Sequence, residues 1–166
     1  DFLFRGTARL RDILGQDFRL MVIGDGTERR HLEELARMLG ISRQIVFTGK
    51  IENTRVRHYL NAADAFLFAS KSETQGIVLL EAITAGLPVL TTAVCGYAHY
   101  IVDANCGEAI AEPFRQETLN EILRKALTQS SLRQAWAENA RHYADTQDLY
   151  SLPEKAADII TGGLDG

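Results

Sequence analysis

The feature that most constrains the fold is a regular alternation of short apolar runs with amphipathic stretches along the chain. The runs are apolar at nearly every position, which is typical of strands buried on both faces of a sheet. Five runs are predicted to be strands, at residues 18–24, 44–49, 65–70, 88–93 and 107–112. Because the stretches between them have helical spacing, the pattern predicts a parallel sheet covered by helices on both faces, with right-handed crossovers.

One domain is expected over residues 1–166. The fold class is α/β, with a single Rossmann-like, doubly wound parallel sheet. Residues from about 115 to 162 show helical spacing alone and are predicted to be C-terminal helices. Gly40 and Gly86 each follow an apolar helical stripe, at the position where glycine commonly ends a helix.

The turn after the first strand contains Gly24, Asp25 and Gly26. It resembles the start of a dinucleotide-binding motif, but the third glycine of that motif is absent because Arg29 occupies its position. Asp25 with Glu28 has the spacing of a capping box at the start of the next helix. We therefore interpret this segment as a turn and a helix cap.

Composition and charge exclude several classes of function. The 166 residues are 46% hydrophobic with a net charge of −4 and interspersed charges, so no basic stripe points to nucleic acid. Cys95 and Cys106 are isolated, which argues against a disulfide framework or a zinc site. Without a signal peptide or an apolar run of about 18 residues, a cytoplasmic protein is expected. Because the pattern is already under way at Asp1, we expect a piece of a longer chain.

Candidate ligand sites are the turns beyond the carboxyl ends of the strands, where doubly wound sheets bind their ligands. These turns are residues 24–27, 49–53, 70–76 and 93–97. The third turn leads into a helix predicted over 77–86, with Gly76 directly before it. Free N–H groups and the helix dipole make such a helix start suitable for phosphate oxygens.

Two carboxylates flank this helix start. Glu73 lies in the turn, and Glu81 lies about a turn and a half inside the helix. Carboxylates accept hydrogen bonds from paired hydroxyls, so Glu81 suits a ribose and Glu73 a sugar. A diphosphate between two such carboxylates is the layout that a nucleotide sugar requires. The same spacing also fits a second interpretation, in which Glu81 is a solvated helix residue and Glu73 is a loop carboxylate without a ligand. Both interpretations stay open.

The segment ETQGIVLLE resembles the E-x7-E signature of retaining glycosyltransferases with the GT-B fold, and AITAGLPVLTT continues the resemblance in register. Upstream, LMVIGDGTERRHLEELARMLGISRQIVFTGKI is similar to the strand–helix–strand of that family. From GIVLLEA to the C-terminus the chain more closely resembles the lipopolysaccharide core glucosyltransferases of enteric bacteria. The resemblance covers nearly the whole chain and identifies it as the C-terminal, nucleotide-sugar-binding half of a GT-B fold.

The resemblance implies a role for each matching residue of the signature. Glu73 corresponds to the first signature glutamate, which contacts the donor sugar near the reacting carbon. Glu81 corresponds to the second glutamate, which binds the ribose. The backbone of Gly76, Ile77 and Val78 would lie against the sugar and the diphosphate.

The resemblance also extends to two other turns. Lys50 and Ile51 belong to the turn whose backbone contacts the nucleobase in the family. The family places an Arg and a Lys on an upstream loop, where they neutralise the leaving diphosphate. Aligned with that loop, Phe4 stands at the Arg position and Arg5 at the Lys position. Arg5 would supply a cation for phosphate oxygens, whereas Phe4 cannot; alternatively, residues 1–6 are an end without function.

The activity implied by the resemblance is transfer of glucose from UDP-glucose to the heptose of the lipopolysaccharide inner core, with retention and without a metal or other cofactor. An N-terminal acceptor domain would be missing, so this chain is expected to bind the nucleotide without transferring sugar. Two alternatives stay open: a fragment of another GT-B enzyme, such as an epimerase or phosphorylase, and a non-catalytic Rossmann-like module. Exposed basic residues such as Arg29, Arg30 and Arg37 leave open a weak contact with the inner membrane surface.

Overall fold

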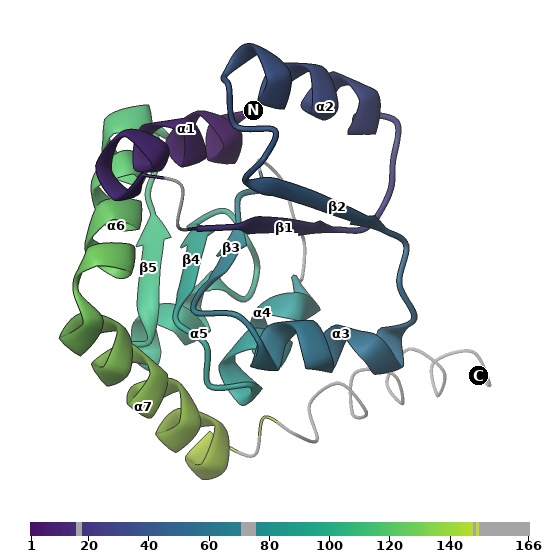
Figure 1. The fold of residues 1–166 in the computed structure, drawn as a ribbon. Coiled ribbons are helices and arrows are strands. Elements are labelled where there is room, and N and C mark those ends of the chain that lie inside the picture. The colour runs from purple at the N-terminus through teal and green to yellow at the C-terminus, as the bar shows by residue number, and fades with distance from the viewer. Residues whose placement is uncertain (16–17, 71–75, 148, 150–166) are drawn as a thin grey trace.

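The computed structural model is an α/β arrangement in which five strands alternate with helices (Figure 1). It describes residues 1–15, 18–70, 76–147 and 149. The strands are β1 (Leu20–Ile23), β2 (Ile45–Gly49), β3 (Phe66–Phe68), β4 (Val89–Thr92) and β5 (Gly107–Ile110). The helices are α1 (Phe2–Leu14), α2 (Arg29–Met38), α3 (Asn53–Asn61), α4 (Ile77–Thr84), α5 (Ala98–Asp103), α6 (Gln116–Thr128) and α7 (Ser130–Gln147). Each of the five predicted strands is confirmed, and their pairings are parallel.

The strands form two sheets, which differs from the single sheet predicted. β1 pairs with β2, and β3, β4 and β5 pair in that order. Figure 1 shows β1 and β2 running across the direction of the other three strands. A cleft of about 1830 Å³ has β1 on one side and β3 on the other. Apolar periodicity predicts which residues form strands, but it carries no information on which strand edges pair, and this explains the error.

The three-stranded sheet is covered on both faces, as predicted for parallel strands. β4 is buried at all four positions. Val89 packs in the cluster formed mainly by α4, α5 and α7, whereas Leu90 packs with α1 and α6. Successive side chains of a strand point to opposite faces, so these two residues anchor the two helix layers.

The first residues form a helix that was not predicted. Phe4 is 5% exposed and packs in the cluster that contains Leu35 and Ile45. Gly6 lets α1 approach α6 closely, because a Cβ there would lie 2.7 Å from Cδ1 of Leu123. Residues 2–6 therefore form the start of a helix and not a loop, because the apolar side chains of this segment pack in the core; the predicted role of Arg5 at a phosphate is not tested by this arrangement.

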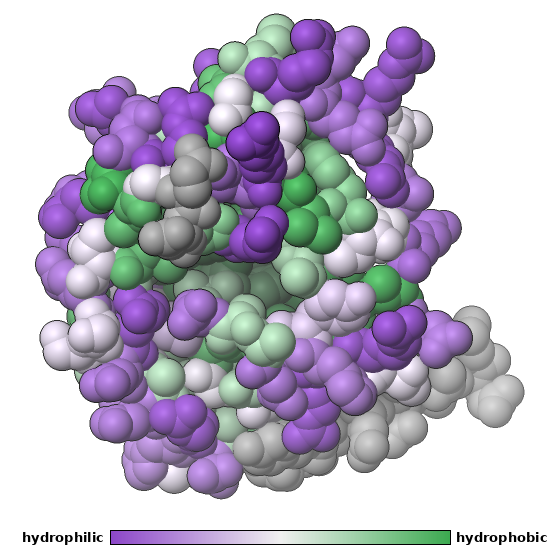
Figure 2. Space-filling model, viewed as in Figure 1, coloured by the Kyte–Doolittle hydropathy of each residue, from purple (hydrophilic) through white to green (hydrophobic). Residues whose placement is uncertain are grey.

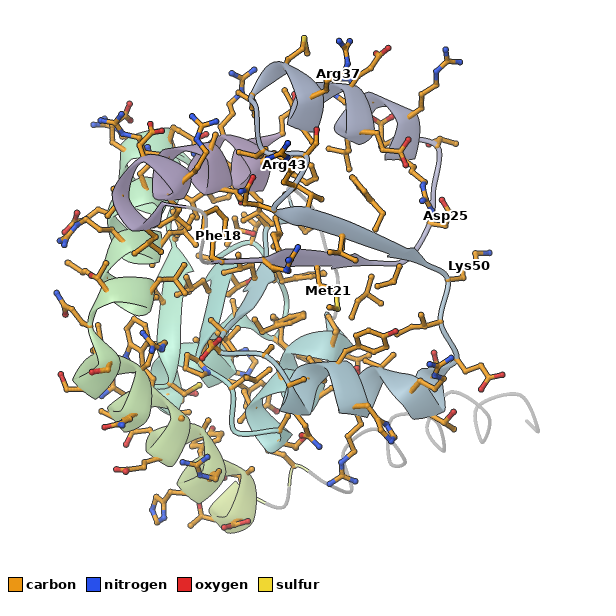
Figure 3. All side chains as sticks on the ribbon, in the orientation of Figure 1. Phe18, Met21, Asp25, Arg37, Arg43 and Lys50 are labelled. Carbon is orange, nitrogen blue, oxygen red and sulfur yellow. The ribbon has the colours of Figure 1, made fainter. Side chains whose placement is uncertain are left out.

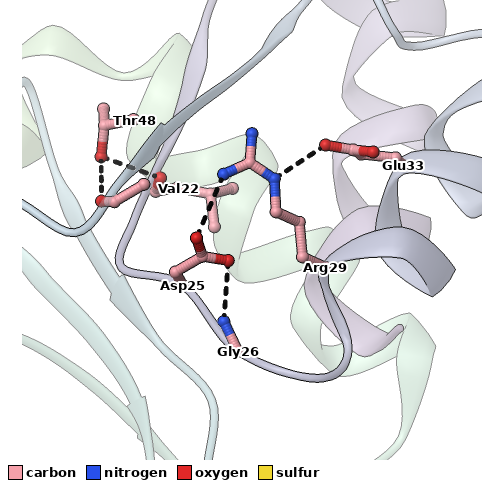
Figure 4. A network of polar contacts seen from close by, with 7 residues as sticks. Val22, Asp25, Gly26, Arg29, Glu33 and Thr48 are labelled. Carbon is pink, nitrogen blue, oxygen red and sulfur yellow. Dashed lines mark hydrogen bonds and ion pairs between the residues drawn. The ribbon is translucent and has the colours of Figure 1, made fainter.

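The start of α2 also differs from the prediction. The helix begins at Arg29, and Glu28 at its N-cap makes no side-chain capping hydrogen bond. Asp25 Oδ1 instead accepts a hydrogen bond from the backbone N–H of Gly26 at 3.0 Å, and its other oxygen lies 3.6 Å from Arg29 Nη1 (Figure 4). Arg29 Nε donates to Glu33 Oε1 at 2.9 Å. The predicted capping box is wrong because the helix begins only at Arg29, and Asp25 bonds to the N–H of Gly26 and pairs with Arg29 instead.

Two helices end at the predicted glycines. Gly40 after α2 has φ +68°, and Gly86 after α4 has φ +71°. The N–H of Gly86 donates to the carbonyl of Ile83, and the N–H of Leu87 donates to the carbonyl of Ala82. This Schellman pattern satisfies the last carbonyls of α4. Helices α6 and α7 confirm the predicted C-terminal helical region as far as Gln147, and the remainder of that prediction lies outside the described residues.

Candidate functional site at the strand ends

The carboxyl ends of β3 and β4 and the first turns of α4 border the cleft. Ser70, Val78, Glu81 and Thr92 are among its lining residues. Figure 2 shows the hollow at the centre of this face, with apolar surface at its base and polar residues around it. Met21, labelled in Figure 3, extends from β1 and lines the same cleft. Residues distant in the sequence therefore line one cleft.

The start of α4 has the geometry predicted for a phosphate site. Gly76 is the N-cap and adopts a left-handed conformation with φ +70° and ψ 45°, which glycine tolerates without strain. Among the described residues, no side chain caps this helix. Because the first N–H groups of a helix have no acceptor within it, the amides of Ile77 and Val78 are suited to an external anion. Val78 is partly buried, and Ile77 is 38% exposed.

Glu81 lies one turn from Val78 on the side of α4 that lines the cleft. Within the described ranges, no side-chain hydrogen bond or ion pair engages its carboxylate. The residue is exposed, yet partial loss of water around the carboxylate raises its pKa above the ordinary 4.5. A carboxylate at the edge of a cleft, with no protein partner in this part of the chain, is a suitable acceptor for the hydroxyls of a ligand.

Glu73 lies outside the described residues, so its position relative to Glu81 stays a prediction. Arg5 is placed on α1, where it is exposed and lines the same cleft as Glu81. The predicted role of Arg5 at the diphosphate stays a prediction, although the residue is helical and not in a loop. Nearby, Asp1 Oδ1 lies 2.9 Å from Nε2 of His31, which joins the start of α1 to α2.

The two other predicted donor-binding residues lie away from the cleft. Lys50 and Ile51 follow the end of β2, and neither lines the cleft. Figure 3 shows Lys50 near Asp25, at the carboxyl ends of β1 and β2. A hydrogen bond from Gly24 N–H to the carbonyl of Gly49 joins these two ends. Their predicted role at a nucleobase is not tested by this arrangement.

Thr92 is a cleft residue that was not predicted from the sequence. Its hydroxyl Oγ1 lies 2.5 Å from the carbonyl oxygen of Ser70, so the ends of β4 and β3 are joined beside the cleft. The available signal was a pair of polar residues, Thr91 and Thr92, at the end of an otherwise apolar strand.

Two further features of the described part of the chain concern metal sites and membrane spans. In those ranges, no group of three or more His, Cys, Asp or Glu side chains is arranged to hold a metal ion. Among the described helices, none combines the length and the apolar character needed to cross a bilayer.

Parallel strands that alternate with helices, with a cleft at the strand ends, define a Rossmann-like α/β domain of the kind found in GT-B glycosyltransferases. Residues 1–143 match the family described as Glycosyl transferases group 1, and the chain belongs to this family. The α/β class with parallel strands and the predicted family are therefore confirmed.

Two matches to WaaG, one in sequence and one in structure, cover most of this chain. It is 64% identical over 160 residues to the lipopolysaccharide glucosyltransferase WaaG of Escherichia coli K12, a match that covers 96% of this chain and 42% of that protein. A crystal structure of WaaG superposes with a TM-score of 0.88 at 62% identity, covering 98% of this chain and 43% of that one. The chain thus spans less than half the length of these relatives, and it matches their C-terminal part.

A third relative is a C-terminal domain by itself. The crystal structure of this domain from the group 1 protein LpcC of Francisella tularensis superposes with a TM-score of 0.73 at 26% identity. The match covers 86% of the present chain and 76% of that domain.

Proposed function

We propose that this chain is the nucleotide-sugar-binding domain of a retaining glucosyltransferase that transfers glucose from UDP-glucose to the lipopolysaccharide inner core. Support comes from the 64% identity to a protein named as a lipopolysaccharide glucosyltransferase. The single observation that carries the proposal is the start of α4. No side chain among the described residues caps this helix, and its residues Val78 and Glu81 line one cleft, where the Glu81 carboxylate has no partner among the described residues.

The amino end of α4 would hold the diphosphate. The N–H groups of Ile77 and Val78 would donate to phosphate oxygens, and the helix dipole would add a favourable field for the negative charge. Gly76 would let the backbone approach the ligand closely, since it has no side chain. Donors that are already oriented towards developing charge commonly contribute about 3 kcal/mol each to lowering a barrier.

The flanking side chains would orient the donor and stabilise the departing UDP. Glu81 would accept hydrogen bonds from the ribose hydroxyls, and Glu73 would contact the sugar. Arg5 lines the cleft and would supply positive charge to the leaving diphosphate. Catalysis would then depend on orientation and on electrostatic stabilisation of the leaving group. We propose that no metal ion or other cofactor takes part.

The acceptor would bind to a separate N-terminal domain, since the chain spans 42% of the relative's length. The acceptor would be the lipopolysaccharide core, on the cytoplasmic side of the inner membrane, where weak contact of the protein with the membrane surface is also proposed. By itself, the present chain would bind UDP and would not transfer glucose.

Isothermal calorimetry with UDP tests this assignment. Glu81→Ala is expected to weaken UDP binding about tenfold or more, because hydrogen bonds to a charged group contribute roughly 1.5–3 kcal/mol. Glu138→Ala is the matched control, since Glu138 is exposed on α7 and does not line the cleft. Equal heats for wild type and Glu81→Ala, or no binding by wild type, would refute the proposal.

A further inference from the structure

The last two residues of β4 are buried polar side chains. Thr91 is 1% exposed and Thr92 is 2% exposed, although the strand lies at the centre of its sheet. A hydroxyl buried at such a position is costly unless it forms a hydrogen bond. Both side chains meet this requirement with backbone carbonyls of the neighbouring strand region.

The two hydroxyls donate to different backbone carbonyls, although both lie 3.5 Å from Cys95 Sγ. Thr91 Oγ1 donates to the carbonyl of Phe68 at 2.9 Å, within the paired part of β3, where Phe68 lies opposite Thr91 in register. Thr92 Oγ1 donates to the carbonyl of Ser70 at 2.5 Å, beyond the end of β3. Only the bond from Thr92 holds a residue, Ser70, that lies beyond the paired residues of β3 and β4.

Thr92 also connects to the turn that follows β4. Its carbonyl accepts a hydrogen bond from Cys95 N–H at 3.1 Å, and Cys95 Sγ lies 3.5 Å from Thr92 Oγ1. A hydroxyl has one proton, and the carbonyl of Ser70 can only accept. Towards Cys95 Sγ, Thr92 Oγ1 can therefore only accept, and the same sulfur also lies 3.5 Å from Thr91 Oγ1. Thr92 is thus bonded to two turns at the carboxyl ends of the strands.

We infer that Thr92 is a positioning residue for the nucleotide site and acts through the carbonyl of Ser70. The inference rests on the proposed function, because it concerns the same cleft, which both Thr92 and Ser70 line. Thr92 holds the backbone at Ser70, just beyond β3, and Ser70 lines the same cleft as Val78 and Glu81 of α4. Its effect is expected on ligand affinity, whereas Thr91 is expected to affect stability alone.

The test compares UDP affinity by calorimetry in paired variants of the 166-residue chain. Thr92→Val is expected to weaken UDP binding about fivefold to tenfold, consistent with the loss of one hydrogen bond. Thr92→Ala is the second variant, because a valine methyl at the hydroxyl position would collide with the carbonyl of Ser70, which lies at 2.5 Å. Thr92→Ser keeps the hydroxyl and is expected to bind UDP within twofold of wild type.

The controls are Thr91→Val and Thr91→Ala, which remove an equally buried hydroxyl one residue earlier. These variants are expected to lower Tm as the Thr92 variants do, while leaving UDP affinity within twofold of wild type. If wild type binds UDP and the Thr92 variants bind equally well, or the Thr91 variants lose as much affinity, the positioning role is wrong. If wild type does not bind UDP, the proposed function fails and the inference fails with it.

Discussion

The ring of Phe4 lies 6.1 Å, centroid to centroid, from the ring of Phe47, so α1 and β2 share one apolar cluster. A side chain aligned with a phosphate-binding arginine therefore serves in the core of this domain.

Phe4→Ala is expected to destabilise the protein by about 3–5 kcal/mol, since it leaves a cavity in this cluster. Urea denaturation followed by circular dichroism would measure the change in the free energy of unfolding. Ile13→Ala is a control on the same helix, because Ile13 is 46% exposed and its truncation should cost little. Similar losses for the two variants would contradict the structural role of Phe4.

Gly107→Ala is expected to destabilise the domain by about 3 kcal/mol or more, because overpacking a filled site forces the backbone to shift. An added Cβ at this position would lie 1.8 Å from the carbonyl oxygen of Val89, its partner across β4 and β5. Gly26→Ala is the control, since a Cβ there meets nothing within 4 Å. Thermal unfolding should separate the two variants clearly, and a Tm for Gly107→Ala equal to that of wild type would argue against the β4–β5 register.

Burial of the Cys106 thiol makes the stability of the domain depend on pH in the alkaline range. The side chain is fully buried, and burial raises the pKa of its thiol from 9.0 to about 12. Between these values the unfolded chain has released the thiol proton while the folded chain retains it, so stability falls as pH rises above about 9. Cys106→Ala should reduce this fall, as measured by urea unfolding at pH 8 and pH 10. Parallel slopes for wild type and variant would show that Cys106 is not responsible.

Iodoacetamide offers an independent measurement on the same thiol. The reactive species is the thiolate, so Cys106 should remain unmodified in the folded protein at pH 8 and react after unfolding in urea. Mass spectrometry of the peptide that contains Cys106 would record both states. Rapid modification in the folded protein would indicate that the thiol is accessible.

Glu81 is expected to reduce stability while it serves ligand binding. Partial burial raises the pKa of its carboxyl above 4.5, so the folded state holds the proton more tightly than the unfolded state. The contribution of Glu81 to stability is therefore most favourable below about pH 4.5 and is lost as pH rises through the raised pKa. Glu81→Gln should increase Tm at pH 7 by at most a few degrees, with the gain absent at pH 4, and should weaken UDP binding. A lower Tm at pH 7 would mean that the carboxylate has a stabilising partner.

Sequence patterns were sufficient for the local elements of the fold. Gly76 was expected directly before an apolar helix, and it is the left-handed residue at the N-cap of α4. Gly86 was expected to end that helix, and it adopts the required positive φ. Both outcomes follow because glycine preferences and helical spacing act over a few neighbouring residues. The predicted strands were confirmed for the same reason, whereas the helix α1 was overlooked when its residues were aligned with a loop.

The sequence by itself determined which segments become strands, where α4 begins and ends, and the family to which the chain belongs. Tertiary structure alone decided that the strands divide between two sheets and that Phe4 enters the core. It also decided that Arg5 and Glu81 border one cleft and that Thr92 bonds to Ser70. These features depend on burial and hydrogen bonding between residues far apart in the chain. The free energies of these interactions are set by how the elements pack. The local periodicity of the sequence does not predict that packing.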